Sequence, residues 1–166
     1  MYKGDQFNLC DCYRLLGGIC CSRGETEKAI DHYEAALKIA SSFNWHSTQF
    51  WIHYSLADLF FKENRFGDAH THVEHAKSHA ADNPYHLGRV TELQARFWYK
   101  RGMLKEAKSE ALRATDIYQK IGATKDAERC RDLRTIKEAA SHELDSDGEL
   151  LETVLLPTPV NSSFSA

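Results

Sequence analysis

The chain has 166 residues, of which 42% are hydrophobic and 27% charged, a composition typical of one soluble globular domain. No apolar run approaches the roughly 20 residues of a membrane-spanning helix, and a net charge of -3 argues against a nucleic-acid binder, which would be strongly basic. The first nine residues lack the pattern of a secretory signal, so we expect a cytoplasmic protein with reduced thiols.

A short pattern with the spacing of a helical turn occurs three times along the chain. The three copies are GETEKAIDHYEAA from residue 24, NRFGDAHTHVEHA from residue 64 and GMLKEAKSEALRA from residue 102. Each copy begins with Gly24, Asn64 or Gly102, residue types that adopt a left-handed conformation and so can end one helix before the next begins. The pattern therefore predicts three helical hairpins, each with its turn at one of these residues.

Apolar residues, most of them alanine, follow each turn at positions i, i+4 and i+7, which share one face of a helix. They are Ala29, Tyr33 and Ala36, then Ala69, Val73 and Ala76, then Ala107, Ala111 and Ala114. Alanines on a buried face let a second helix approach to within about 8 to 10 Å, so we expect neighbouring hairpins to stack on one another.

The last part of the chain changes character. A helix with apolar residues on one side is expected over residues 124–141, after a break at Gly122, and would cap the stack. This places a repeat domain over residues 5–142 and an acidic, largely disordered tail over residues 143–166. Within the tail, ELLETVLLP is apolar enough either to rest on the last repeat or to dock in a groove as a linear peptide.

The repeated unit resembles the tetratricopeptide repeat. The first copy has Tyr13, Leu16, Gly17 and Cys20 at the family's first-helix spacing, followed by Ala29, Tyr33 and Ala36. The resemblance implies an all-α fold, a right-handed α-α superhelix of three hairpins, at about residues 9–42, 47–81 and 85–120, plus the C-terminal capping helix. Units of 38 to 40 residues are longer than usual and are similar to the repeats of kinesin light chains and of the C-terminal arrays of STAND-type NTPases.

The resemblance also implies a concave groove, lined by the first helix of each hairpin, that binds an extended or helical peptide. The groove would combine basic and aromatic side chains, which suits an anchor side chain beside a carboxylate or phosphate. The expected groove residues are Arg14, Trp51, Tyr54, Asp58, Phe61, Lys62, Arg89, Arg96, Tyr99 and Lys100. The function expected from this resemblance is a non-catalytic protein–protein interaction module that uses no cofactor.

A second interpretation is a regulatory sensor or oligomerisation segment of a larger protein similar to STAND-type NTPases, truncated or encoded separately. The first predicted helix starts almost at Met1 with no capping segment before it, which is typical of a truncated repeat array. This interpretation predicts an exposed apolar N-terminal face and self-association of the chain.

Two kinds of chemistry find little support. His72, His75 and His79 fall on one side of a predicted helix, as zinc ligands can, but the alanine positions already define the buried side, which favours a polar, solvent-facing row and no metal site. The chain also lacks a phosphate-binding loop, a G-x-S-x-G elbow and an H-E-x-x-H motif, so nothing supports an enzyme.

Overall fold

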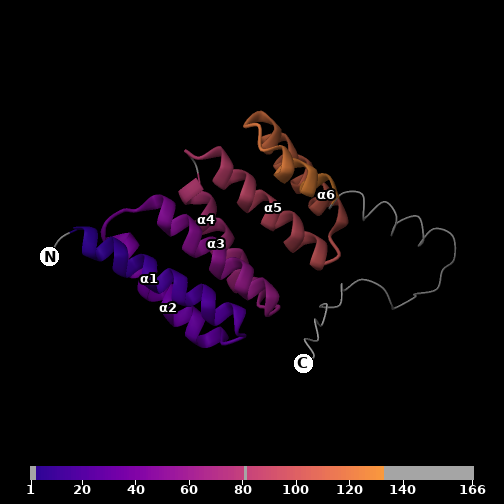
Figure 1. Cartoon of the computed structure of the whole chain (residues 1–166). Helices are drawn as coiled ribbons and strands as arrows, with labels where there is room; N and C mark the ends of the chain where they lie inside the picture. Colours follow the sequence, from indigo (N-terminus) through magenta and orange to yellow (C-terminus); the bar gives the residue numbers. More distant parts are fainter. Residues whose placement is uncertain (1–2, 81, 133–166) are drawn as a thin grey trace, which may run out of the picture.

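The computed structural model describes residues 3–80 and 82–132, and these residues form helices joined by short turns (Figure 1). A further helix begins at residue 124 and is described as far as residue 132. The all-α fold expected from the sequence is confirmed. The helices are α1 Lys3–Ser22, α2 Thr26–Ser42, α3 His46–Lys62, α4 Phe66–Ala80, α5 Pro84–Lys100 and α6 Leu104–Lys120.

Successive helices pair into three hairpins: α1 packs on α2, α3 on α4 and α5 on α6. The hairpins stack in chain order, because α2 also contacts α3 and α4 also contacts α5 (Figure 1). The first helices lie in one layer, where α3 contacts both α1 and α5. The rest of the expected capping helix, the boundary at residue 142 and the tail over residues 143–166 lie outside the described residues.

The turns within the hairpins lie where the sequence predicts them. Gly24, Asn64 and Gly102 have φ values of 73°, 60° and 73°, in the left-handed region. The link between the first two hairpins uses the same device at Asn44, with φ of 54°. Asparagine tolerates this conformation better than other residues with a side chain, which explains how it replaces glycine at two of these positions.

The alanine faces are buried between neighbouring helices, as expected. Ala29, Ala69 and Ala107 have exposed fractions of 0%, 1% and 2%. The helices of a hairpin approach each other closely at Gly17, where an added Cβ would lie 2.8 Å from the ring of Tyr33. The stack is therefore held by small residues beneath aromatic or aliphatic ones, a packing that larger residues would disrupt.

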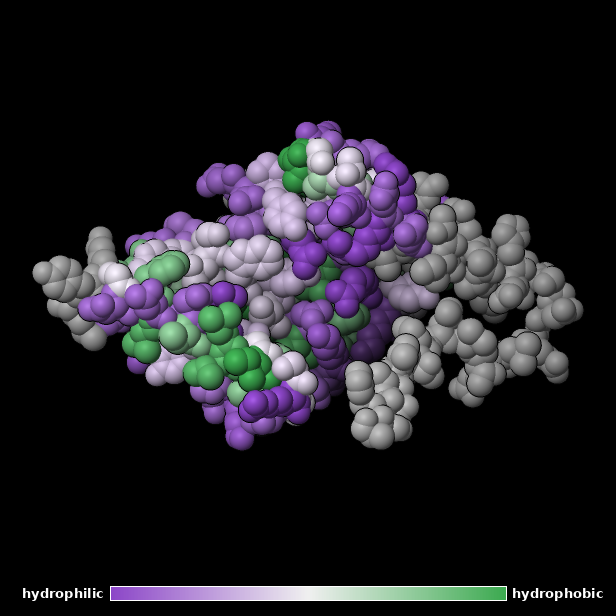
Figure 2. All heavy atoms as spheres, viewed as in Figure 1, coloured by the Kyte–Doolittle hydropathy of each residue, from purple (hydrophilic) through white to green (hydrophobic). Residues whose placement is uncertain are grey.

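Hydrophobic side chains gather on one part of the surface, over α1 (Figure 2). Leu9, Leu15, Leu16 and Ile19 keep 41%, 51%, 42% and 46% of their surface exposed. This agrees with the apolar N-terminal face that the second sequence interpretation predicts. None of the described helices is both long enough and apolar enough to cross a membrane.

Candidate functional site

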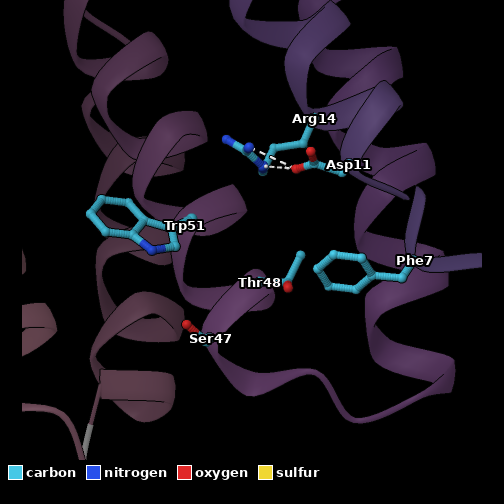
Figure 3. A pocket seen from close by; sticks show the side chains of 6 residues that line it. All are labelled: Phe7, Asp11, Arg14, Ser47, Thr48 and Trp51. Atoms are coloured by element: carbon cyan, nitrogen blue, oxygen red, sulfur yellow. Dashed lines mark hydrogen bonds and ion pairs between the residues drawn. The ribbon is translucent and has the colours of Figure 1, made fainter. Parts of the chain in front are cut away.

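A hollow of about 260 Å³ lies between the first helices of the first two hairpins (Figure 3). From α1 it is lined by Phe7, Asp11 and Arg14. From α3 it is lined by Ser47, Thr48 and Trp51. The hollow combines two aromatic rings, two hydroxyl groups and an ion pair, so it can hold an apolar side chain beside a polar or charged group.

Arg14 is held in place by its neighbour one helical turn earlier. Oδ1 of Asp11 accepts hydrogen bonds from Nε of Arg14 at 3.0 Å and from Nη2 at 2.7 Å (Figure 3). The guanidinium is about one-third exposed, which leaves its outer edge accessible from the hollow. A positioned and partly exposed guanidinium is well suited to binding a carboxylate or phosphate.

Trp51 joins the hollow to an aromatic cluster between the second and third hairpins. Its ring lies edge-on to Phe50, Tyr54 and His86, with centroid separations of 5.0, 5.8 and 5.3 Å. These contacts fix the orientation of the indole although it is only partly buried. An anchor side chain entering the hollow would therefore meet a rigid aromatic wall.

Between α3 and α5 the predicted groove residues bind one another. Nη2 of Arg89 donates a hydrogen bond of 3.1 Å to the hydroxyl of Tyr54, and its guanidinium lies over the same ring. Burial raises the pKa of Tyr54 above its usual value. Burial by itself would lower the pKa of Arg89, but the neighbouring Tyr54 and Glu92 outweigh it and raise that pKa. Both groups thus keep their usual charge at neutral pH.

A second set of contacts lies further along the same two helices. Asp58 binds Nζ of Lys62 at 2.7 Å and lies 3.6 Å from Nη1 of Arg96. Lys100 donates a hydrogen bond to the backbone carbonyl of Phe61, and its ammonium group lies over the Phe61 ring. Phe61 itself is buried, so it forms the floor beneath these cations. Tyr99, at the outer edge, is 40% exposed.

The structure thus brings the expected groove residues together in two groups on α3 and α5, and it brings Arg14 and Trp51 together around the hollow. Sequence reasoning missed Phe7, Ser47 and Thr48, which complete the hollow. Phe7 lies before residue 9, where the first repeat is expected to begin. Ser47 and Thr48 lie at the start of a helix, where hydroxyl residues are common and do not indicate a binding site. Whether the ten expected residues contact a partner stays a prediction.

The sequence indicates a solvent-facing row of histidines, which the structure bears out only in part: His75 is exposed, whereas His72 and His79 are half-buried. His72, His75 and His79 of α4 pack against His53 of α3, with ring centroids 4.9 to 5.7 Å from its ring. Nδ1 of His53 lies 3.0 Å from Nδ1 of His72. Burial, and then the three neighbouring histidines, lower the pKa of His53 to about 3. Within the described residues, no group of three or more His, Cys, Asp or Glu has an arrangement that could hold a metal ion.

Comparison with protein families finds a match over the first part of the chain. Residues 9–82, which span the first two hairpins, match the model of the tetratricopeptide repeat. These two hairpins are tetratricopeptide repeats. Comparison with curated proteins and with solved structures finds no match.

Tetratricopeptide repeats are helical hairpins that stack into an array, as the three hairpins here do. They generally act as interaction modules without catalytic chemistry, so the matched repeats indicate a protein partner. The hollow between α1 and α3 falls within the matched repeats. The long-repeat type seen in kinesin light chains and STAND-type NTPases stays a prediction.

Proposed function

We propose that this tetratricopeptide-repeat chain binds a peptide segment of a partner protein along the layer formed by α1, α3 and α5. The observation that carries the proposal is the hollow between α1 and α3, with Trp51 and Phe7 as apolar walls and Arg14 beside them. A ligand that fits has an apolar anchor side chain close to a carboxylate or phosphate. The protein would act inside the cell, a location that suits its five free cysteines.

The anchor of the ligand is assigned to the hollow because the charged groups between α3 and α5 hold these two helices together. Asp58 pairs with Arg96 and Arg89 binds Tyr54 across that contact, whereas Arg14 pairs only within α1 among these contacts and its side chain lines a cavity. A ligand would gain a new ion pair at Arg14 without breaking one between helices. The residues on α3 and α5, including Arg96, Tyr99 and Lys100, would then extend the contact along the groove.

The test begins with a peptide selected for binding to the chain from a random library. The variant Arg14→Glu should weaken its binding about tenfold or more, because the charge facing the anchor's acidic group is reversed. Arg113→Glu is a matched control, since Arg113 also pairs with an acidic residue one turn earlier but lies on α6. Isothermal titration calorimetry would measure both affinities, and equal affinities for the two variants would refute the proposal.

A second measurement locates the ligand. Backbone and side-chain resonances of Trp51 and Tyr54 should shift on binding, followed by those of Arg96 and Tyr99 if the peptide extends along α5. The tail over residues 143–166 would compete for the same groove, since it carries the apolar segment ELLETVLLP within an acidic stretch. Deleting the tail should then raise the affinity for the selected peptide, and an unchanged affinity would end the idea of tail docking.

A second candidate function is a regulatory or oligomerisation segment of a larger repeat protein. The exposed apolar residues of α1 favour it, because an apolar patch of this kind on a surface usually marks an interaction site. Sedimentation equilibrium of the purified chain would test whether it associates with itself. A strictly monomeric chain would count against self-association through α1.

A further inference from the structure

A stripe of four residues runs along the exposed side of α1. Leu9, Cys12, Leu16 and Ile19 are spaced i, i+3, i+7 and i+10 and so share one face of the helix. Leu15 widens the stripe and is 51% exposed. In the part of the chain that the structure describes, no helix covers this face, which Figure 2 shows as the hydrophobic patch over α1.

The same positions are buried in the other two hairpins. Moving 40 residues along the chain gives Gln49, Ile52, Leu56 and Leu59 of α3, with exposed fractions of 6%, 0%, 1% and 5%. A further 38 residues gives Leu87, Val90, Gln94 and Phe97 of α5, of which the last three are buried. The face is therefore built to be covered, and only in α1 is it open.

What covers this face in the other hairpins is a helix with small residues on its contact side. Ile52, Leu56 and Leu59 share one core cluster with Ala29, Ala36 and Ala40 of α2. The side-chain amide of Gln49 also donates a hydrogen bond of 3.1 Å to the carbonyl of Ala40. On α5, Val90 packs in a cluster with Val73, Ala76 and Ala80 of α4.

We propose that the apolar face of α1 binds an amphipathic helix from another polypeptide, one that carries alanines at i, i+7 and i+11 as α2 does. The interface would continue the stacking already present between α2 and α3 and between α4 and α5. Large residues on α1 require small ones opposite, because a second row of leucines would hold the helix axes apart.

A second copy of this chain does not supply such a helix from its described residues. The alanine faces of α2, α4 and α6 are already buried, with Ala36, Ala76 and Ala114 each at 0% exposure. Contact between two copies would have to place the stripe of α1 against itself. The proposed partner is therefore a different polypeptide with an uncovered small-residue face.

This surface is separate from the hollow of the proposed peptide site. Asp11 and Arg14 lie on another side of α1 from Leu9 and Leu16, since each residue turns the helix by about 100°. The inference therefore does not rest on the proposed function. A variant of the stripe can lose helix binding while peptide binding at Arg14 is kept, and the reverse also holds.

The test uses a fluorescent, end-blocked peptide with the sequence of α2, residues 26–42, titrated with the whole chain and followed by fluorescence anisotropy. Saturable binding is expected, and Leu16→Glu should weaken it about tenfold or more. Leu112→Glu is the matched control, since Leu112 is 39% exposed but lies on α6, and it should leave binding unchanged. Ile19→Glu gives a second variant of the stripe if Leu16→Glu alters the circular dichroism spectrum.

A variant of the peptide separates a fitted interface from general adhesion to an apolar patch. Replacing the alanine that corresponds to Ala36 by leucine should weaken binding about tenfold, because the helix could no longer approach closely. Equal or tighter binding of that peptide would overturn the proposal. Binding that persists in Leu16→Glu would show exchange with the chain's own α2 and would also overturn it, as would a dimer that Leu16→Glu dissociates.

Discussion

The second and third hairpins hold their helices together with polar groups of opposite kinds. In the second hairpin the contact between α3 and α4 contains stacked imidazoles around His53, whose low pKa keeps it neutral. In the third, the buried carboxylate of Glu92 on α5 accepts hydrogen bonds from Tyr118 of α6 at 2.9 Å and from Arg129 at 2.6 and 2.7 Å. The contact in the second hairpin requires an uncharged His53, whereas the contact in the third hairpin depends on an ion pair between Glu92 and Arg129.

The difference shows that the same helical hairpin can use different polar contacts at different positions in the stack. The second hairpin lies between neighbours on both sides and packs a neutral, largely aromatic contact. The third is followed by the helix that starts at residue 124, and Arg129 of that helix ties it to α5. This bidentate contact with Glu92 raises the pKa of Arg129, so the guanidinium stays charged. Charge thus specifies where the last described helix docks, while apolar packing stacks the hairpins.

The largest effect is expected from steric change in the third hairpin. A Cβ at Gly88 would lie 2.7 Å from the ring of Tyr118, which is fully buried and held by Glu92. Gly88→Ala should therefore lower the free energy of unfolding by about 3 kcal/mol. Gly67→Ala in α4 is the control, since its Cβ would meet nothing within 4 Å, and it should be neutral or stabilising. Urea unfolding that gives both variants the same midpoint would contradict this packing.

Acid should weaken the second hairpin before the third. The pKa of His53 is lowered to about 3 from its usual 6.5, so below pH 6.5 the unfolded chain binds a proton that the folded chain does not. Stability is therefore lost as the pH falls, by about 2 kcal/mol between pH 6 and pH 4.5 from this histidine. Between pH 6 and pH 4.5, the free energy of unfolding of His53→Gln should therefore fall by about 2 kcal/mol less than that of the unmodified chain.

The control for this experiment is His70→Gln, because His70 is exposed on α4 of the same hairpin and lies outside the cluster around His53. Its unfolding should follow the pH dependence of the unmodified chain. Other groups that face His53 are His72, His75 and His79, and Asp68 lies near His72 and favours its charged form. Identical pH profiles for both variants would mean that the imidazole contact does not control acid sensitivity.

Loss of one charge should affect only the third hairpin. Arg129→Ala removes both hydrogen bonds from this side chain to Glu92 and leaves the buried carboxylate without its closest cation, at a cost of about 1 to 2 kcal/mol. The value is modest because the side chain of Arg129 is 45% exposed. Arg131→Ala, two residues further on the same helix and exposed, should change stability by less than about 0.5 kcal/mol. Thermal unfolding at low salt would compare the two, and equal melting temperatures would argue against the role of the pair.

The smallest effect concerns the turns of the same two hairpins. Asn64 and Gly102 have nearly the same left-handed backbone, with φ of 60° and 73°. Gly102→Asn should therefore cost only about 0.5 kcal/mol, whereas Gly102→Val should cost about 1 to 2 kcal/mol, because a branched side chain clashes in this conformation. Comparable losses for both variants in urea unfolding would show that the turn needs glycine for another reason.

Local features of this fold could be predicted from the sequence, because a helix turn and a helix face depend on neighbouring residues. Gly24, Asn64 and Gly102 as turns and the alanine faces are of this kind. The contacts that distinguish the hairpins join distant residues: Arg129 and Glu92 are 37 positions apart, and His53 and His72 are 19 apart. No periodicity within one helix indicates which of its polar residues meets a partner on another.

The candidate site was predictable to a similar degree. Arg14 and Trp51 followed from the resemblance to the repeat family, which indicates which side of each first helix faces a groove. The resemblance could not indicate that Asp58, Arg89 and Lys62 would be engaged in contacts of their own. Which part of the layer remains open depends on side-chain pairing in three dimensions, and the hollow at Phe7 and Thr48 is the result.

The position of this hollow between two hairpins has a consequence for local opening of the array. Because each hairpin contacts only its neighbours, one end can open while the rest stays folded, and amide hydrogens there exchange with solvent. A bound peptide that contacts both α1 and α3 would link the first hairpin to the second. Occupancy should then slow amide exchange throughout the first hairpin, far beyond the residues that the peptide touches, and leave exchange in α6 unaltered.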